Sequence, residues 1–318
     1  MLGFLIRRIL QAAIVVLIVT IITFILLRLI PGNVAIAVLG PSAYRNPAVL
    51  AQFNAQYGFD KPWFQQYLLW LGHLLQGNLG FSWTLDQSVA SLLGERLPKT
   101  IILVGLSTIL ALIVAVPIGI WQAVRRNKAV DYTFTGLSFL FYAAPTFFVG
   151  TVLILVFSVK LGWFGPEAPQ GGVWNDLSDW RDLTLPVVTL ALVTIALFSR
   201  YMRSAMLDNL TEDWVRTARA KGASQRRVIW RHVFRNSLIP IATLLGLSLP
   251  AIFAGALITE SVFNYPGMGY LFYQSAQRQD YPVLLGFIIV VAIATVIGSL
   301  LADIAYAALD PRVRYVSS

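Results

Sequence analysis

Six long apolar stretches alternate with polar segments along this chain of 318 residues. They lie at about 9–27, 98–123, 134–159, 183–198, 239–263 and 282–308. A hydrocarbon core of about 30 Å requires roughly 20 apolar residues per helix, so each stretch predicts one membrane-spanning helix. The fourth stretch is the shortest and is expected to continue through residues 199–202. The pattern therefore predicts an all-α membrane protein with six transmembrane helices.

The intervening segments organise this prediction into one transmembrane domain, residues 1–318. A first helix at 1–30 is followed by an extracytoplasmic loop at 31–97 and a five-helix core at 98–308. The core contains a cytoplasmic segment at 204–238, and a cytoplasmic tail follows at 309–318. The first apolar stretch follows Arg7 and Arg8 as in a signal peptide. It is too long for one and no small-residue cleavage site follows, so it is predicted to be an uncleaved anchor.

The two outer loops differ in kind. The long loop predicts two surface helices, near 47–57 and 62–75, the second of which is rich in aromatic side chains. Because tryptophan and tyrosine concentrate at the depth of lipid headgroups, we expect this helix in the membrane interface or against the bundle, with a ligand-binding surface as the alternative. The second outer loop, 160–182, is acidic and suits either a partner surface or a solvated loop.

The most polar stretch, residues 208–240, lies between the fourth and fifth spans. Thr211 is predicted to cap a short first helix, which Gly222 ends in the left-handed conformation. Ser224 is predicted to cap a second, amphipathic helix that ends near Asn236. This second helix carries apolar pairs at a spacing of four residues, Ile229 with Val233 and Trp230 with Phe234.

Basic residues are distributed unevenly between the two sides of the predicted bundle. One side holds both termini, the 124–133 loop and the segment after the fourth span. That side carries sixteen of the 24 Lys and Arg residues. Since basic residues near span ends stay cytoplasmic, both termini and the 208–240 segment are predicted to face the cytoplasm. This rule, with contact to anionic lipids, explains the net charge of +9, and nucleic acid need not be invoked as a partner.

Composition supports the membrane assignment and excludes several chemistries. Hydrophobic residues make up 57% of the chain and charged residues 12%, values that a soluble domain of this length rarely reaches. No cysteine is present, which excludes disulfides, thiolate metal sites and a cysteine nucleophile. There is no Gly-Lys pair and hence no G-x-x-x-x-G-K-[ST] phosphate loop, no H-E-x-x-H and no G-x-S-x-G. The chain is therefore predicted to be no enzyme and to hold no cofactor or metal itself.

Charged residues within the apolar stretches are few and lie near their ends, at Arg28, Glu260 and Asp303. All three are expected to reach an interface or a partner. Glu260, beside Thr259, is the one acid that we consider for a substrate path, with a helix cap or a structural ion pair as the alternative. Prolines that are expected to break the spans, as suits helices that flex or line a wet path, are Pro117, Pro145, Pro186 and Pro250.

Short motifs occur along nearly the whole chain. The polar segment contains RTARAKG at 216–222 and RHVFRNSLIP at 231–240. The others are FLIRRIL, RLIPGN, YGFDKPWFQQY, GNLGFSW, ITESVFNYPGMG, RQDYPV and DPRVRY. Together these motifs resemble those of ATP-binding-cassette (ABC) importer permeases of the dipeptide and oligopeptide class, and in particular the first of their two permease subunits.

The polar segment departs from the general importer pattern E-A-A-x-x-x-G in an informative way. The Glu and first Ala of that pattern fall on Arg216 and Thr217, whereas Ala218 and Gly222 match, and the proline expected further on falls on Arg235. This variant is typical of the first subunit of the peptide class. It supports the resemblance to that class and leaves the role of the family's Glu unassigned here.

The resemblance implies a type I importer in the cytoplasmic (inner) membrane of a prokaryote. Its partners would be a second, non-identical permease subunit, two ABC ATPase subunits or domains that bind ATP and Mg, an extracytoplasmic substrate-binding protein and membrane lipids. The helix before Gly222 would be the coupling helix, seated in a groove of one ATPase. The ATPase-coupling residues implied are Arg216, Thr217, Ala218, Arg219, Ala220, Lys221, Gly222, Ala223 and Ser224.

By the same resemblance, ATP binding closes the ATPase pair and moves the coupling helices, and the pore then opens outward to receive ligand. Relatives of this class transport dipeptides, oligopeptides, glutathione, nickel chelates and some sugars, and a peptide is the expected substrate. The main alternative is a secondary transporter that works without ATP. Such folds usually show inverted repeats and coupling carboxylates at mid-membrane, whereas the acids here lie near the span ends.

Overall fold

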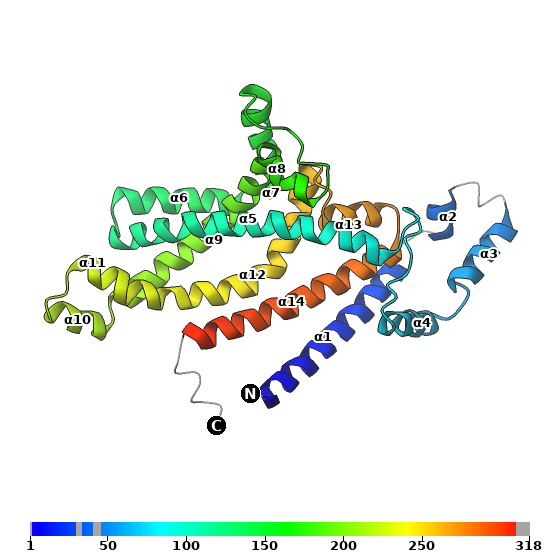
Figure 1. Ribbon diagram of the computed structural model, residues 1–318, viewed down its shortest axis with the longest axis horizontal. Helices are drawn as coiled ribbons and strands as arrows, with labels where there is room; N and C mark the ends of the chain where they lie inside the picture. Colours follow the sequence, from blue (N-terminus) through cyan, green and yellow to red (C-terminus); the bar gives the residue numbers. More distant parts are fainter. Residues whose placement is uncertain (1, 30–33, 41–45, 310–318) are drawn as a thin grey trace. The chain divides into compact units, whose positions relative to one another are not determined.

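The computed structural model describes residues 2–29, 34–40 and 46–309, which form helices joined by turns and short loops (Figure 1). The only β pairing in this described part is an isolated bridge between Phe81 and Ser88. An all-α architecture is therefore confirmed for these residues.

A helix covers each of the six apolar stretches. These helices are α1 (Leu2–Leu29), α5 (Val89–Val124), α6 (Ala129–Ala143) with α7 (Thr146–Leu153) and the π-helical η2 (Ile154–Lys160), α9 (Trp180–Leu210), α12 (Phe234–Val262) and α14 (Tyr281–Leu309). Among the described residues, three helices are long and apolar enough to cross a membrane, in α5, α9 and α14. The α6 and α7–η2 pair makes a fourth if it forms one span.

Shorter helices lie in the connections. They are α2 (Val34–Leu39), α3 (Pro47–Tyr57), α4 (Trp63–Leu75), α8 (Val173–Ser178), α10 (Asp213–Ala220), α11 (Gln225–Arg227), the π-helical η3 (Val228–Val233) and α13 (Met268–Gln277). The two surface helices expected in the long loop are confirmed as α3 and α4. Pro47 sits in the first turn of α3, where its missing N–H leaves no helix bond unmade, and Gly58 ends α3 at φ 71°.

The third predicted span is two helices rather than one. The axes of α6 and of the α7–η2 helix differ by 105°, and the break lies at Pro145. Ala144 is extended (φ −71°, ψ 131°), which is the conformation that a residue before proline prefers. Pro145 therefore ends α6 and starts α7, and the expectation that this proline breaks its span is confirmed.

The other three prolines do not break their helices. α5 and α9 continue through Pro117 and Pro186, and the backbone of α12 continues through Pro250. The expectation that these prolines interrupt the spans is wrong. Each proline removes a single backbone donor, and the remaining hydrogen bonds and packing of a long helix outweigh that loss.

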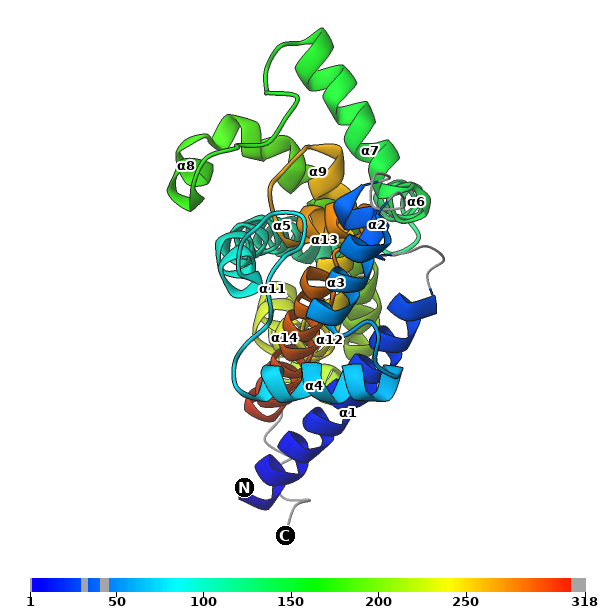
Figure 2. The same ribbon diagram turned by 90° about the vertical axis from the view of Figure 1, so that its right-hand side faces the viewer.

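Two compact units make up the chain: residues 1–99 with 266–296, and residues 100–265 with 297–318. In the first unit, α4 lies across the C-terminal part of α1 (Figure 2), where the rings of Tyr67 and Phe24 are 5.4 Å apart. α5 begins at Val89, ahead of its apolar stretch, because its first turns bury apolar side chains on α13 and α14. The apolar clusters of this unit contain Phe24, Leu27, Val89, Leu92, Leu93, Met268, Leu271, Tyr281, Val283, Leu284 and Leu285.

A buried carboxylate organises the polar part of the first unit. Asp280 is fully buried and accepts hydrogen bonds from the hydroxyls of Ser82 and Thr84 at 2.5 and 2.7 Å. The backbone amides of Trp83 and Thr84 donate to it as well, at 3.3 and 3.2 Å. Buried charge requires such partners. The GNLGFSW and RQDYPV motifs therefore meet here, although Ser82 and Asp280 are 198 residues apart in the chain.

The second unit is a layer of long helices, with α5, α6, α9 and α12 running lengthwise (Figure 1). The turn between α5 and α6 lies at the same end of these helices as α10 and α11 (Figure 1). Gly119 allows α5 to approach α9 closely, because a Cβ there would lie 2.6 Å from Cβ of Met202. The core at this end contains Ala115, Ile120, Ala123, Phe198, Met202, Met206, Val215, Val228, Ile229, Val233 and Ile241.

Candidate functional site

The first helix of the polar segment, α10, begins one residue later than the sequence predicts. The Thr211 hydroxyl donates to the carbonyl of Asp208 at 2.8 Å, and the Thr211 amide donates to the same carbonyl at 3.3 Å. Thr211 therefore ends α9, and Glu212, with extended backbone, precedes α10. The predicted cap at Thr211 is wrong because α9 continues beyond the membrane span as far as Leu210.

Gly222 ends α10 as predicted. Its φ is 81°, and its amide donates to the carbonyl of Arg219 at 2.9 Å. The amide of Ala223 donates to the carbonyl of Ala218 at 3.1 Å, which completes a Schellman motif. A Cβ on Gly222 would meet no atom within 4 Å, so the left-handed backbone is the only feature that requires glycine at this position.

The inner face of α10 anchors the segment to the second unit. Val215 is fully buried, and Trp214 and Ala218 pack on the same core, which α5, α9 and η3 also form. Ala223 packs on this core from the other side of the turn. Among residues 216–224, Ala218 and Ala223 therefore anchor the segment to the core. The other seven residues of this range are exposed: Arg216, Thr217, Arg219, Ala220, Lys221, Gly222 and Ser224.

The outer face of the segment is strongly basic. Its exposed cationic side chains are Arg216, Arg219, Lys221, Arg226, Arg227, Arg231 and Arg235. Within the described residues, the only ion pair that any of them forms is Arg216 with Asp213, at 3.3 Å. Both side chains of that pair are largely exposed, so it contributes little to stability. This face can therefore meet an acidic partner surface without first breaking strong internal contacts.

The second helix of the segment continues into the fifth span. Ser224 caps it as predicted, since its Oγ accepts a hydrogen bond from the amide of Arg227 at 3.4 Å. α11, η3 and α12 then follow without a break, so the expected end near Asn236 is wrong. Packing on α9 explains the continuation: Val233 is fully buried, and the Ser237 hydroxyl lies 3.2 Å from the carbonyl oxygen of Ala205.

Trp230 lies on the exposed side of this continuous helix. Its side chain is 53% exposed, and its ring packs edge-on against Phe234 with centroids 5.3 Å apart. The spacing of four residues predicts that pair, but it does not predict which apolar pair faces solvent. Side chains that line an open hollow beside the turn are Ser224, Arg226, Arg227, Trp230 and Arg231.

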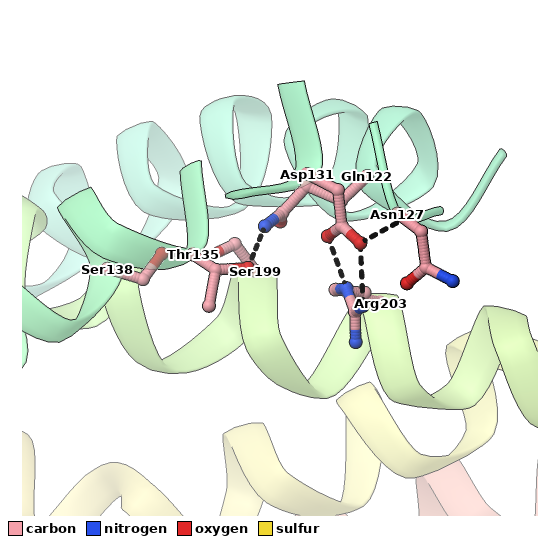
Figure 3. A network of polar contacts seen from close by, with 7 residues as sticks. All are labelled: Gln122, Asn127, Asp131, Thr135, Ser138, Ser199 and Arg203. Carbon is pink, nitrogen blue, oxygen red and sulfur yellow. Dashed lines mark hydrogen bonds and ion pairs between the residues drawn. The ribbon is translucent and has the colours of Figure 1, made fainter. Parts of the chain in front are cut away.

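A polar network ties the α5–α6 turn to α9 (Figure 3). Arg203 donates from Nε and Nη2 to the two oxygens of Asp131, at 2.6 and 2.8 Å. The amide of Asn127 donates to Asp131 at 3.0 Å, and Asn127 itself has a left-handed φ of 61°. Such a bidentate pair is strong and directional. The one sequence signal for it is an acid, Asp131, beside the basic loop at 124–133.

Two further hydrogen bonds extend this network along α6 (Figure 3). The Gln122 side chain of α5 donates to the Thr135 hydroxyl at 3.2 Å. The hydroxyls of Ser138 and Ser199 are 3.2 Å apart and both are buried. α6 is therefore fixed to α5 on one side and to α9 on the other, and α9 leads directly into α10.

Glu260 and Thr259 lie near the other end of α12. Both side chains are buried, and the Thr100 hydroxyl of α5 donates to Glu260 at 2.6 Å. The expected helix-ending turn is confirmed here: Asn264 has φ 51°, and the amide of Tyr265 donates to the carbonyl of Glu260 at 2.8 Å. Packed helices cover Glu260, so it does not reach an interface, but its carboxylate has the Thr100 hydroxyl as a partner.

The other two charges expected near span ends differ from Glu260. Arg28 is half-buried among aromatic rings in the first unit. The side chain of Asp303 lies outside the described residues. In the second unit, the basic face of the polar segment does not include Glu260 or Thr259, which lie at the other end of α12.

Part of the acidic loop at 160–182 packs on the turn that follows α12. The Tyr265 hydroxyl donates to the carboxylate of Asp176 at 2.8 Å, and both side chains are buried. Burial, together with the neighbouring Asp176 carboxylate, raises the pKa of Tyr265 well above its ordinary value, so the phenol stays protonated. The amide of Ala168 also donates to the carbonyl of Phe263 at 2.8 Å. This part of the loop is structural.

Two family models match the chain. Residues 115–315 match "Binding-protein-dependent transport system inner membrane component", and residues 1–104 match the corresponding N-terminal model. Between them these matches include the polar segment and the long loop.

Known proteins resemble the chain along nearly its full length. The oligopeptide transport system permease protein AppB of Bacillus subtilis is 40% identical, over 99% of this chain and 100% of that protein. The di/tripeptide transport system permease protein DppB of Pseudomonas aeruginosa is 37% identical, over 93% and 94%. Among solved structures, a chain of the MetNI methionine ABC transporter has a TM-score of 0.54 at 17% identity, covering 67% of this chain and 96% of that one.

Proposed function

Because the chain belongs to the family of binding-protein-dependent transport system inner membrane components, we propose that it is the pore-forming permease of an ATP-driven importer of peptides. The observation that carries the peptide assignment is full-length similarity to oligopeptide and di/tripeptide permeases. Members of the family are permease subunits and not enzymes, so ATP hydrolysis belongs to partner subunits.

The proposed architecture is a single transmembrane domain with six spans, in which α6 with α7–η2 is the third. Both termini and the polar segment face the cytoplasm of a prokaryotic inner membrane, and the loop at 31–97 lies outside. The basic residues on the 124–133 loop and the polar segment support this orientation. The position of the α5–α6 turn and α10 at one end of the second unit agrees with it (Figure 1).

The proposed partners are a second, non-identical permease, two ABC ATPase subunits or domains and an extracytoplasmic binding protein. We propose that residues 216–224 contact one ATPase. The features that support this contact are an exposed basic face, a fixed turn at Gly222 and an inner face locked to the core through Val215. A displacement of α10 would pass to α9 through this core and to α12 through the unbroken α11–η3–α12 helix.

The first test is the composition and activity of the purified complex. Tagged protein purified from its native operon should carry a second membrane subunit and ATPase subunits, and the reconstituted complex should take up a labelled peptide in the presence of ATP and binding protein. Omitting ATP is the control, and it should abolish uptake. A homodimer of this chain that transported peptide without ATPase subunits would contradict the proposal.

We also propose that Glu260 and Thr259 serve the substrate path by holding the end of α12 against α5 rather than by touching ligand. The buried hydrogen bond from Thr100 to Glu260 and the turn that starts at the Glu260 carbonyl support this role. A hydrogen bond contributes about 0.5–1.5 kcal/mol, and leaving one buried partner unsatisfied costs about 1–3 kcal/mol. Replacement of either partner should therefore loosen the joint and slow the conformational cycle.

Glu260→Gln and Thr100→Val test this joint from its two sides. Both variants should lower the maximal uptake rate per assembled complex several-fold and leave KM for peptide unchanged, because neither side chain contacts ligand. The measurement is initial-rate uptake in proteoliposomes, normalised to the amount of complex. A rise of KM in Glu260→Gln alone would instead indicate direct ligand contact, and unchanged uptake in both variants would remove Glu260 from the path.

A further inference from the structure

Four sequence motifs that the proposed function does not use meet at one pocket in the first unit. RLIPGN contributes Arg28, YGFDKPWFQQY contributes Phe59 and Gln66, GNLGFSW contributes Trp83, and RQDYPV contributes Tyr281. All five side chains line the same pocket, which lies between the end of α1, α4 and the start of α14. Segments far apart in the chain therefore build a single site.

Two cationic side chains line this pocket, Arg28 and Lys61, and Arg28 has aromatic neighbours in place of an acid. The Cζ atom of Arg28 lies 5.0, 4.5 and 5.6 Å from the ring centres of Phe24, Phe59 and Tyr281. Within the described residues, no carboxylate pairs with Arg28. Aromatic faces attract the guanidinium but leave its charge and its N–H donors available to an anion. The pocket therefore suits a ligand with a negative group.

Gln66 adds a second, independent requirement on the ligand. Its side chain is 8% exposed, and Nε2 donates to the carbonyls of Lys61 and Phe59 at 2.7 and 3.4 Å. These bonds fix the orientation of the amide, and its Oε1 is left without a hydrogen-bond partner. Buried acceptors are nearly always paired. A ligand that fills the pocket would satisfy both groups if it carried an anion together with an N–H or O–H donor.

The surroundings of the pocket indicate the depth of lipid headgroups. Arg28 lies in the last turn of α1. The outward apolar residues of that helix, which suit contact with acyl chains, include Ile18, Ile22, Ile25, Leu26 and Leu29. On α4, Trp63, Phe64 and Leu68 are 51%, 64% and 58% exposed, as in an aromatic belt at a membrane surface. The phosphodiester is the common anion at this depth.

We propose that this pocket binds the headgroup of a membrane phospholipid, with the phosphate against Arg28 and a headgroup donor on Oε1 of Gln66. The acyl chains would lie along the exposed apolar face of α1. Ethanolamine and glycerol headgroups carry N–H or O–H donors, whereas choline carries none. The site therefore favours phosphatidylethanolamine and phosphatidylglycerol over phosphatidylcholine, and it holds α1 and α4 at the membrane surface.

Native mass spectrometry of the assembled transporter with defined lipids tests this site. The wild-type complex should retain phosphatidylethanolamine or phosphatidylglycerol about tenfold more tightly than phosphatidylcholine, since one hydrogen bond to a buried acceptor is lost with choline. Arg28→Met keeps the apolar stem and removes the charge, so it should weaken retention of the preferred lipids about tenfold. Arg28→Lys keeps the charge but not the planar donors, so its retention should fall between the two.

Arg278→Met is the matched control, because Arg278 is exposed at the end of α13 and does not line the pocket. Its lipid retention should equal that of the wild type. Equal retention of choline and ethanolamine lipids by the wild type would overturn the proposal without any variant, and so would wild-type retention in Arg28→Met. Displacement of the lipid by millimolar inorganic phosphate would also overturn it, because the pocket would then hold a free anion.

Discussion

Gly222→Val should uncouple ATP hydrolysis from peptide uptake while the complex still assembles. Gly222 has φ 81°, and a β-branched residue in this left-handed region is strained by roughly 1–2 kcal/mol. Because a Cβ would meet no neighbouring atom, the strain can be relieved only by a change in the backbone. The Schellman bonds of the turn would then break, and α10 would lose its fixed position relative to α11.

Uptake and ATPase activity of the reconstituted complex, measured together, check this expectation. The number of peptides transported per ATP hydrolysed should fall at least several-fold in Gly222→Val. Gly162→Val is a matched control, because Gly162 also has a left-handed φ, 65°, with no atom near its Cβ position, but it lies in the 160–182 loop, outside the proposed ATPase contact. It should carry the same local strain and keep normal coupling. Unchanged coupling in Gly222→Val would remove the turn from the ATPase contact.

The hydrophobic pattern predicts the positions of the helices well, because membrane helices are defined by length and apolarity. It predicts helix ends less well where tertiary packing decides them. Thr211 has the chemistry of an N-cap, but α9 continues to Leu210 and Thr211 is the C-cap of that helix. Gly222 needs no such context, since only its backbone conformation matters.

Proline alone does not predict whether a span breaks. Pro145 lies at a 105° bend, whereas Pro186 is buried within a continuous α9. Both prolines lie within apolar stretches and look alike in the sequence. The difference arises from what surrounds each helix, and a single sequence does not contain that information.

The polar contacts of the candidate site could not be paired from sequence. Asp131 and Arg203 are 72 residues apart, and Thr100 and Glu260 are 160 residues apart. No periodicity connects such residues, because their proximity follows from how α5, α6, α9 and α12 pack. The sequence therefore predicts the turn at Gly222, which is local, and misses the network that holds the neighbouring helices.

Breaking the Asp131–Arg203 pair should lower the stability of the complex and impair coupling. Asp131→Asn keeps the size of the side chain, but it leaves Arg203 without its carboxylate and turns an amide NH2 toward groups that donate. Loss of hydrogen bonds to a charged group corresponds to about 1.5–3 kcal/mol. Because α9 leads into α10, a looser α9 should also reduce the number of peptides transported per ATP hydrolysed. The thermal midpoint of the purified complex and its uptake-to-ATPase ratio should both fall.

Three companion variants separate this ion pair from general damage to the fold. Arg203→Lys keeps the charge but loses the bidentate geometry, so it should have a smaller effect than Asp131→Asn. Combining Asp131→Asn with Arg203→Gln removes both charges, and the double variant should be less destabilised than the sum of the two single changes. Asp213→Asn breaks the exposed pair with Arg216 and should leave the thermal midpoint nearly unchanged. If the effects of Asp131→Asn and Arg203→Gln simply added, the two residues would act independently and the network would not be the element that holds α9 in place.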